Sequence, residues 1–165
     1  AADRGAHVIN LSVSMEERAK VLQEAVQAAH ARGVVVIASA GNTGRDDVNY
    51  PSALSQAFSV TAVDAFDVRA PFASFGSEID LSAPGVDLLG AYPSETGTAR
   101  WSGTSFSAAL VTGAYAVLRE LEPSAEHEHL LNRWEDTSEP LEDANPEDAG
   151  DLGAGRLDAG SASTP

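Results

Sequence analysis

The stretch from Val34 to Gly44, VVVIASAGNTG, decides the fold class of this chain. Its first six residues are apolar or small, and they show no alternation between apolar and polar side chains. A run of this kind predicts a parallel strand that is covered on both faces. The loop from Ala40 to Gly44 then leaves the carboxyl end of that strand, which is the edge where ligands bind in open α/β sheets.

The residues before this stretch predict a strand followed by a helix. His7 to Val13 is rich in apolar and β-branched residues, which is typical of a buried strand. Ser14, with Glu17 three residues later, predicts a capping box. Apolar residues then recur at the helical period, at Met15, Ala19, Leu22, Val26 and Ala29. We expect Gly33 to end the helix and residues 7–39 to form a right-handed strand–helix–strand unit.

The remainder of the chain extends the same α/β pattern. We expect strands at 58–63, 79–81 and 88–91, with a turn at 83–85, and helices at 105–120 and 124–134. The sequence after Trp134 is acidic and predicted to be loop-like. The predicted fold is therefore α/β, a partial doubly wound parallel sheet with flanking helices, in one domain over residues 1–160 with a tail at 161–165.

Composition limits the possible partners. The 165 residues carry 25 acids and 10 bases, a net charge of −15, which disfavours nucleic acid. Twelve of the acids lie between Glu120 and Asp151, and we interpret them as a solvated surface or an adaptation to high salt. The chain has no cysteine, and its apolar runs are shorter than the roughly 20 residues that a membrane span needs. We expect no membrane partner.

Two residues are candidates for catalysis, each with a simpler alternative. Ser105 opens a predicted helix, where a serine is commonly an N-cap. It could instead be a nucleophile, with helix-start amides stabilising an oxyanion beside it. Asn42 stands between Gly41 and Thr43, where asparagine is commonly a turn residue. Its side-chain NH₂ could instead donate to a developing oxyanion.

Seven motifs follow one another along the chain in a fixed order. They are NLSVS (10–14), VVVIASAGNTG (34–44), YPSAL (50–54), SVTAVD (59–64), FASFGSEIDLSAPG (72–85), GTSFSAALVTG (103–113) and GAGRLDA (153–159). In motif and order, from about Gly5 to Ala159, the chain resembles the subtilisin-like serine proteases, or subtilases. The resemblance implies a subtilisin-like fold, of which this chain would be the C-terminal half, and a hydrolase that cleaves peptide bonds.

The resemblance implies roles for individual residues. Ser105 matches the nucleophile, and Asn42 matches the oxyanion-hole asparagine that would act together with the Ser105 backbone N–H. The remaining matched positions imply substrate binding. Ser12, Val13 and Ser14 match the strand edge that pairs with substrate, Ala40 and Gly41 match part of the opposite wall, and Thr104 precedes the nucleophile. A peptide would bind in an extended conformation between these edges.

The chain departs from the family pattern in three ways. Ala109-Leu110 stands where the family usually has Pro-His, a change that we expect to affect packing only. Ser14 and Met15 stand where the family often has glycines, which could narrow the substrate groove. The family's catalytic Asp and His motifs lie upstream of every motif seen here.

None of the four histidines lies in a sequence context that suggests the base. We expect His7 to be structural on a core strand, His30 to lie near a helix end, and His127 and His129 to be solvated. A serine without a base is a poor nucleophile, so the chain alone should be nearly inactive.

Three interpretations remain open at this point. The chain could be a fragment of an active endopeptidase, a catalytically inert module that binds a peptide or partner, or half of an enzyme completed by a second chain. The absent start methionine favours a processed or partial sequence. Through the edge of the strand at 7–13, we expect pairing with a complementing N-terminal fragment or self-association. The resemblance requires no cofactor, allows calcium without an assignable site, and implies secretion.

Overall fold

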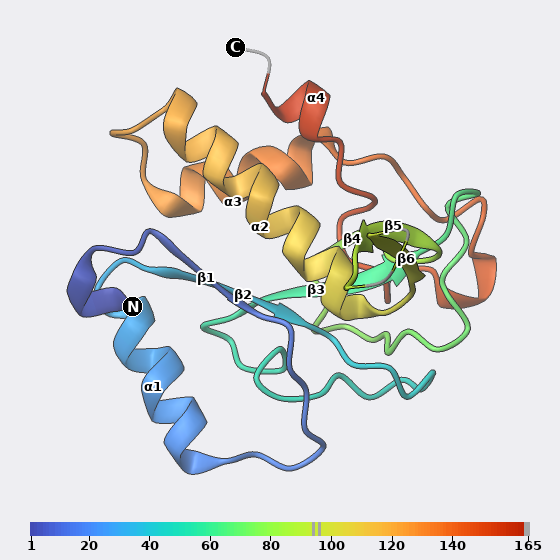
Figure 1. Cartoon of the computed structure of the whole chain (residues 1–165), viewed down its shortest axis with the longest axis horizontal. Helices are drawn as coiled ribbons and strands as arrows, with labels where there is room; N and C mark the ends of the chain where they lie inside the picture. The colour runs from blue at the N-terminus through green and yellow to red at the C-terminus, as the bar shows by residue number, and fades with distance from the viewer. Residues whose placement is uncertain (94, 96, 164–165) are drawn as a thin grey trace.

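The computed structural model describes all residues except 94, 96, 164 and 165. Its centre is a parallel sheet in the order β1 (Val8–Leu11), β2 (Val35–Ser39), β3 (Phe58–Val63) and β4 (Leu81–Pro84) (Figure 1). In register, Val8 pairs with Val35, Ile37 with Phe58 and Val60 with Leu81. The predicted α/β class with a parallel sheet and flanking helices is confirmed.

Helices cover both faces of this sheet. Helix α2 (Thr104–Leu121) packs against all four strands on one face, with α3 (His127–Thr137) and α4 (Ala159–Ala162) beyond it (Figure 1). Helix α1 (Lys20–His30) lies on the other face. Successive residues of the β2 segment point to opposite faces. Accordingly Val35 and Ile37 join the core cluster of α2, whereas Val34 and Val36 join that of α1.

The predicted capping box at Ser14 is wrong. Helix α1 begins at Lys20, and its N-cap residue Ala19 is extended and makes no side-chain cap bond. The segment before α1 pairs with a part of the chain that is distant in sequence. Met15 and Tyr50 exchange two backbone hydrogen bonds of 2.9 Å each. This long-range pairing keeps the backbone at Met15 out of the helix, and Met15 is exposed rather than part of the helix face.

Three further boundaries differ from those predicted. Ala83 and Pro84, expected in a turn, belong to β4, of which Pro84 is the last residue. Helix α3 begins at His127 rather than after Ser124, and Glu126 is its N-cap residue. The acidic C-terminal segment includes a 3₁₀-helix (Pro146–Asp148) and α4, so the expected boundary at residue 160 falls within a helix whose Ala162 is buried.

The C-terminal segment completes the sheet at β4. Ser82 of β4 donates its backbone N–H to Gly155 (2.8 Å) and accepts from Leu157 (2.8 Å). Its hydroxyl also donates to the carbonyl of Leu152 at 2.8 Å. On the other side of the sheet, β1 is the outermost strand, and its residues are only partly buried.

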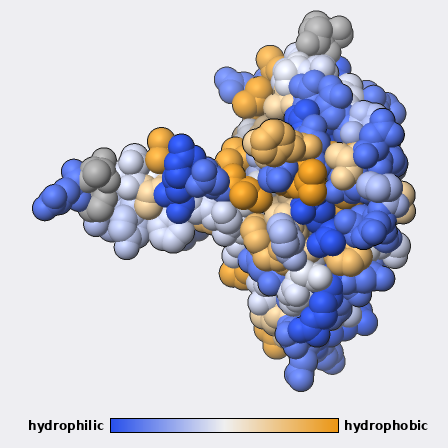
Figure 2. All heavy atoms as spheres, turned by 90° about the vertical axis from the view of Figure 1, so that its right-hand side faces the viewer, coloured by the Kyte–Doolittle hydropathy of each residue, from blue (hydrophilic) through white to orange (hydrophobic). Residues whose placement is uncertain are grey.

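Two short strands form a separate hairpin. β5 (Leu88–Ala91) and β6 (Thr98–Trp101) pair antiparallel, and this arm extends from the body of the molecule (Figure 2). A further 3₁₀-helix, Ala2–Arg4, precedes β1. Within the part of the chain that the structure describes, no helix combines the length and apolar character needed to cross a bilayer.

Candidate active site

The carboxyl ends of β1 and β2 meet the start of α2. Ser12 directly follows β1, the loop with Gly41 and Asn42 follows β2, and Ser105 lies in the first turn of α2. Ser12 donates its hydroxyl to the backbone carbonyl of Ser105 at 2.7 Å, and the Ser105 hydroxyl lies 3.4 Å from the carbonyl of Ser12. Residues 93 positions apart are thereby held side by side.

Ser105 is not the N-cap of α2. Gly103 occupies that position. The Ser105 hydroxyl is therefore available for chemistry, and its one long hydrogen bond to a carbonyl is weak. The positive end of the α2 dipole lies at the same place, where it favours negative charge.

Asn42 is held to the start of α2 by its side-chain oxygen. Oδ1 of Asn42 accepts from the backbone N–H of Thr104 and from the Thr104 hydroxyl, each at 3.0 Å. Because the carboxamide oxygen is engaged, its NH₂ group is turned away from these bonds and remains a donor. In this loop the positive φ values belong to Gly41 (116°) and Gly44 (67°) rather than to Asn42, which lies at a bend.

Gly41 is required by both its conformation and its surroundings. A Cβ at this position would lie 2.9 Å from Cγ of Asn49 and 3.0 Å from Oγ of Ser74. Its positive φ is also one that side chains rarely adopt. The loop can therefore pass close to Asn49 and Ser74 only with glycine here.

The residues expected to bind substrate separate into two kinds. Val13 and Ser14 are exposed and Ser12 is partly buried, so this edge is accessible. Ala40, Gly41 and Thr104 are buried. Ala40 packs in a core cluster and the Thr104 hydroxyl bonds to the Gly41 backbone, so these three residues could meet a peptide only through the backbone.

An aromatic row beside Ser105 escaped the sequence analysis. Trp101 stacks on Phe106, with ring centroids 6.3 Å apart, and Tyr92 meets Trp101 edge-on at 5.4 Å. The row links the β5–β6 hairpin to the residue that follows Ser105. Trp101 and Phe106 flank Ser105 closely in the sequence, which was the available signal.

All four histidines lie away from Ser105. His7 precedes β1 at the amino end of the strand, where it is exposed, so its predicted place in the core is wrong. His30 ends α1 as expected, and His129 is exposed beside Glu122. His127 is not solvated as predicted, because its Nδ1 contacts the Tyr115 hydroxyl and its ring stacks on Tyr115.

Burial lowers the pKa of His127, and the charges of Arg119 and His7 add to this effect. His127 is therefore a neutral structural residue near the amino ends of the strands. Ser105 lies at the carboxyl ends of the strands, at the opposite end of the sheet. No imidazole of this chain is placed to take its proton.

The family model described as the subtilase family matches residues 1–155. The chain belongs to the subtilase family. It is 35% identical to Subtilisin BL of Lederbergia lenta over 145 residues, and the match covers 88% of this chain and 54% of that protein. It is 36% identical to Subtilisin DY of Bacillus licheniformis over 148 residues, with 87% and 54% covered.

Solved structures show the same relationship. The patellamide maturation protease PatA superposes with a TM-score of 0.86 at 33% identity, covering 98% of this chain and 63% of that one. The prenylagaramide maturation protease PagA gives 0.84 at 30% identity, with 98% and 62% covered. This subtilase chain thus spans about half the length of the curated relatives it matches.

Proposed function

We propose that Ser105 and Asn42 are the nucleophile and an oxyanion-hole donor of a serine endopeptidase. In this proposal, the general base and its aspartate come from a segment outside these 165 residues. The observation that carries the proposal is the anchoring of the Asn42 side chain through its oxygen on Thr104, next to Ser105. That anchor presents an NH₂ group beside a helix start and an uncommitted hydroxyl.

The chemistry assigns a role to each of these groups. Ser105 Oγ attacks the carbonyl carbon of the scissile peptide bond, and its proton passes to the imidazole supplied from outside. The carbonyl electron pair moves to oxygen, and this oxyanion accepts hydrogen bonds from the Asn42 NH₂ and the Ser105 N–H. Collapse of the intermediate expels the amine, which takes the proton, and water then releases the acid from Ser105 by the same steps.

The surface next to Ser105 supports an external source for the base. Strand β1 is an open edge, and its residues are not fully buried. A segment that paired with β1 would extend the sheet and lie beside Ser12, which contacts Ser105.

The substrate in this proposal is an extended peptide. It would pair along the accessible edge at Ser12, Val13 and Ser14, with the Gly41 backbone opposite. Export from the cell is part of the proposal, supported by the likeness to bacterial subtilisins. Calcium remains a prediction from the family. Within the described residues, no group of three or more His, Cys, Asp or Glu is placed to hold a metal.

A complementation assay tests the proposal. The chain is mixed with an N-terminal subtilase segment that carries the Asp and His motifs, and peptide hydrolysis is measured. We expect activity only in the mixture, and loss of that activity in Ser105→Ala. A matched change at an exposed serine away from the site, Ser77→Ala, should leave it intact.

The inert-module alternative makes a different prediction for the same assay. Its supporting observation is that no histidine of this chain lies near Ser105. It predicts peptide binding without turnover in every mixture in which the two segments demonstrably associate. That result would overturn the proposal.

A further inference from the structure

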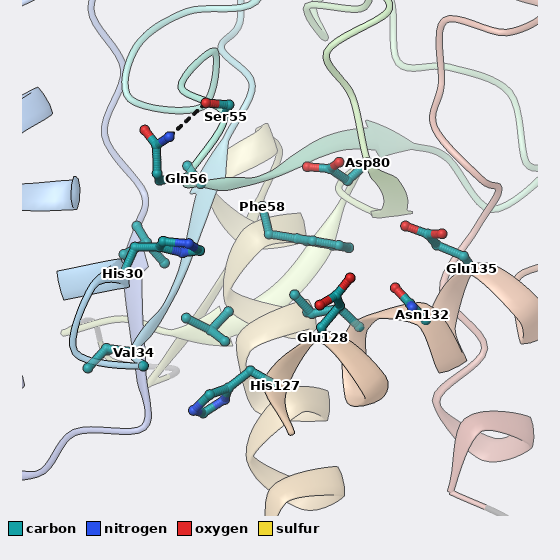
Figure 3. Close-up of a pocket in the computed structure, with 15 residues that line it drawn as sticks. His30, Val34, Ser55, Gln56, Phe58, Asp80, His127, Glu128, Asn132 and Glu135 are labelled. Atoms are coloured by element: carbon teal, nitrogen blue, oxygen red, sulfur yellow. Dashed lines mark hydrogen bonds between the residues drawn. The ribbon is translucent and has the colours of Figure 1, made fainter. Parts of the chain in front are cut away.

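A cavity of about 440 Å³ lies at the amino ends of the strands (Figure 3), whereas Ser105 lies at their carboxyl ends. It is open to solvent on one side and is lined by the end of α1, the segments that lead into β2, β3 and β4, and one side of α3. Its size is in the range of pockets that accept small ligands or a large side chain. None of the residues assigned to catalysis or substrate binding lines it.

The cavity combines an apolar base with carboxylates. Phe58 and Leu131 supply apolar surface. The carboxylates of Asp80, Glu128 and Glu135 lie around the outer end of the Phe58 ring (Figure 3). A guest with an apolar stem and a positive end would match both parts.

The negative charge of the cavity has no cationic partner in its walls. No lysine or arginine is among the residues that line it in the described structure. Asp80 is bonded through Oδ2 to the backbone N–H of Ser59 at 2.6 Å. Burial raises the pKa of Asp80 to about 6, and the nearby charge of Glu135 adds to the rise. A positive charge nearby would stabilise the ionised form of this carboxyl group.

The two imidazoles in the walls lie apart from the carboxylates of Asp80 and Glu135. Burial, together with the charges of Arg119 and His7, lowers the pKa of His127, and its Nδ1 contacts the Tyr115 hydroxyl. In Figure 3, the His30 and His127 rings lie on the other side of the cavity from Asp80 and Glu135. The carboxylate side is therefore left for an incoming cation.

We propose that this cavity binds a basic side chain of a peptide or protein, with an arginine guanidinium at Asp80, Glu128 and Glu135 and its stem on Phe58 and Leu131. A guanidinium is planar and presents several donors, so it can bond to more than one carboxylate at once. The site is distinct from the Ser105 groove and does not depend on the proposed catalytic function.

Calorimetric titration with N-acetyl-arginine amide tests the site. N-acetyl-norleucine amide is the uncharged probe with an apolar stem, and potassium and calcium chloride are the inorganic probes. We expect saturable binding of the arginine probe to the chain, and binding at least about tenfold weaker for the norleucine probe. The inorganic cations should not displace the arginine probe at matched ionic strength.

Variants locate the binding. Glu135→Gln, on the exposed side of α3, and Asp80→Asn should each weaken the arginine probe about tenfold or more. Glu120→Gln removes the same charge from α2 outside the cavity and should leave binding unchanged. Since Glu135 is exposed, its variant stays informative if Asp80→Asn fails to fold.

Four outcomes would overturn the proposal. They are equal binding of the norleucine probe, equal weakening by Glu120→Gln, full affinity in Glu135→Gln, and saturation by inorganic cations alone.

Discussion

The two edge strands of the sheet, β4 and β1, differ in whether the chain forms hydrogen bonds along their outer sides. At β4, Ser82 is bonded on its outer side to Gly155, Leu157 and Leu152, and the strand is almost fully buried. At β1, no described residue pairs with the outer side, and the strand is partly exposed. The chain therefore completes its fold at β4 and leaves it open at β1. Ser105 is adjacent to the open edge, through its contact with Ser12.

The largest effect should come from breaking the closed edge. In Gly153→Ala, the new Cβ would lie 2.4 Å from the backbone C and O of Asp80, at the start of β4, and φ is +73°. We expect a loss of about 4 kcal/mol in the free energy of unfolding. Gly150→Ala shares a positive φ of 88° but meets nothing within 4 Å, so it should cost only about 1 kcal/mol. Urea unfolding of both variants would measure the two losses in free energy of unfolding. Equal losses would mean that Gly153 does not pack closely against Asp80.

A second prediction concerns Asn42, the proposed oxyanion-hole donor beside Ser105. In the completed enzyme, Asn42→Ala should lower kcat about 10²–10³-fold, because one oxyanion donor is lost. Asn42→Asp keeps the oxygen that accepts from Thr104 but has no NH₂, so it should be equally impaired. If Asn42→Asp restored activity, Asn42 would serve only to anchor the helix start.

A third prediction concerns pH and the carboxyl group at the start of β4. The folded-state pKa of Asp80, about 6, is above its ordinary value of 3.8. The folded state favours the protonated carboxyl of Asp80. This contribution to stability is therefore complete below pH 3.8 and is lost as the pH rises through about 6. The free energy of unfolding of Asp80→Asn, compared with that of wild type, should therefore rise by about 2 kcal/mol between pH 4 and pH 7.

Urea unfolding at both pH values would check this gain. The lowered pKa of His127 acts in the opposite direction, but it is common to both proteins and cancels in their difference. A difference in free energy that did not change with pH would contradict the burial assigned to Asp80.

The smallest effect should be on self-association through the open side. Val13 is 52% exposed, two residues after the end of β1, and Val13→Lys should weaken association of the isolated chain about tenfold. Val21→Lys introduces the same charge on α1, where the residue is 80% exposed, and should not weaken association. Sedimentation over micromolar concentrations would compare the association of the two variants with that of wild type. A wild-type chain that stayed monomeric at every concentration would contradict self-association through the β1 edge.

Continuous sequence signals predicted much of the fold. The uninterrupted apolar run predicted β2 to within one residue, and the bounds of β3 and β5 were predicted as they stand. The capping box at Ser14 failed because a backbone partner 35 residues away, Tyr50, competes for Met15. Such pairing leaves no local trace in the sequence.

The site was predictable in part. Motif order identified Ser105 and Asn42 as candidates, but the anchor that joins Asn42 to Thr104 spans 62 residues and comes from the fold. His127 looked solvated because its neighbours in sequence are acidic, whereas its partner Tyr115 lies on another helix. The cavity at Asp80 was missed because it is assembled from four separate segments.

The central claim is that Ser105 occupies a nucleophile's position but lacks activation within this chain. The most direct test is the rate at which a fluorophosphonate probe labels Ser105, with Ser105→Ala as the blank. We predict labelling of the isolated chain near that blank, and a rise of several orders of magnitude, towards about 10⁶-fold, when an N-terminal segment supplies His and Asp. Rapid stoichiometric labelling of the isolated chain, or no rise in a demonstrably assembled mixture, would contradict the account.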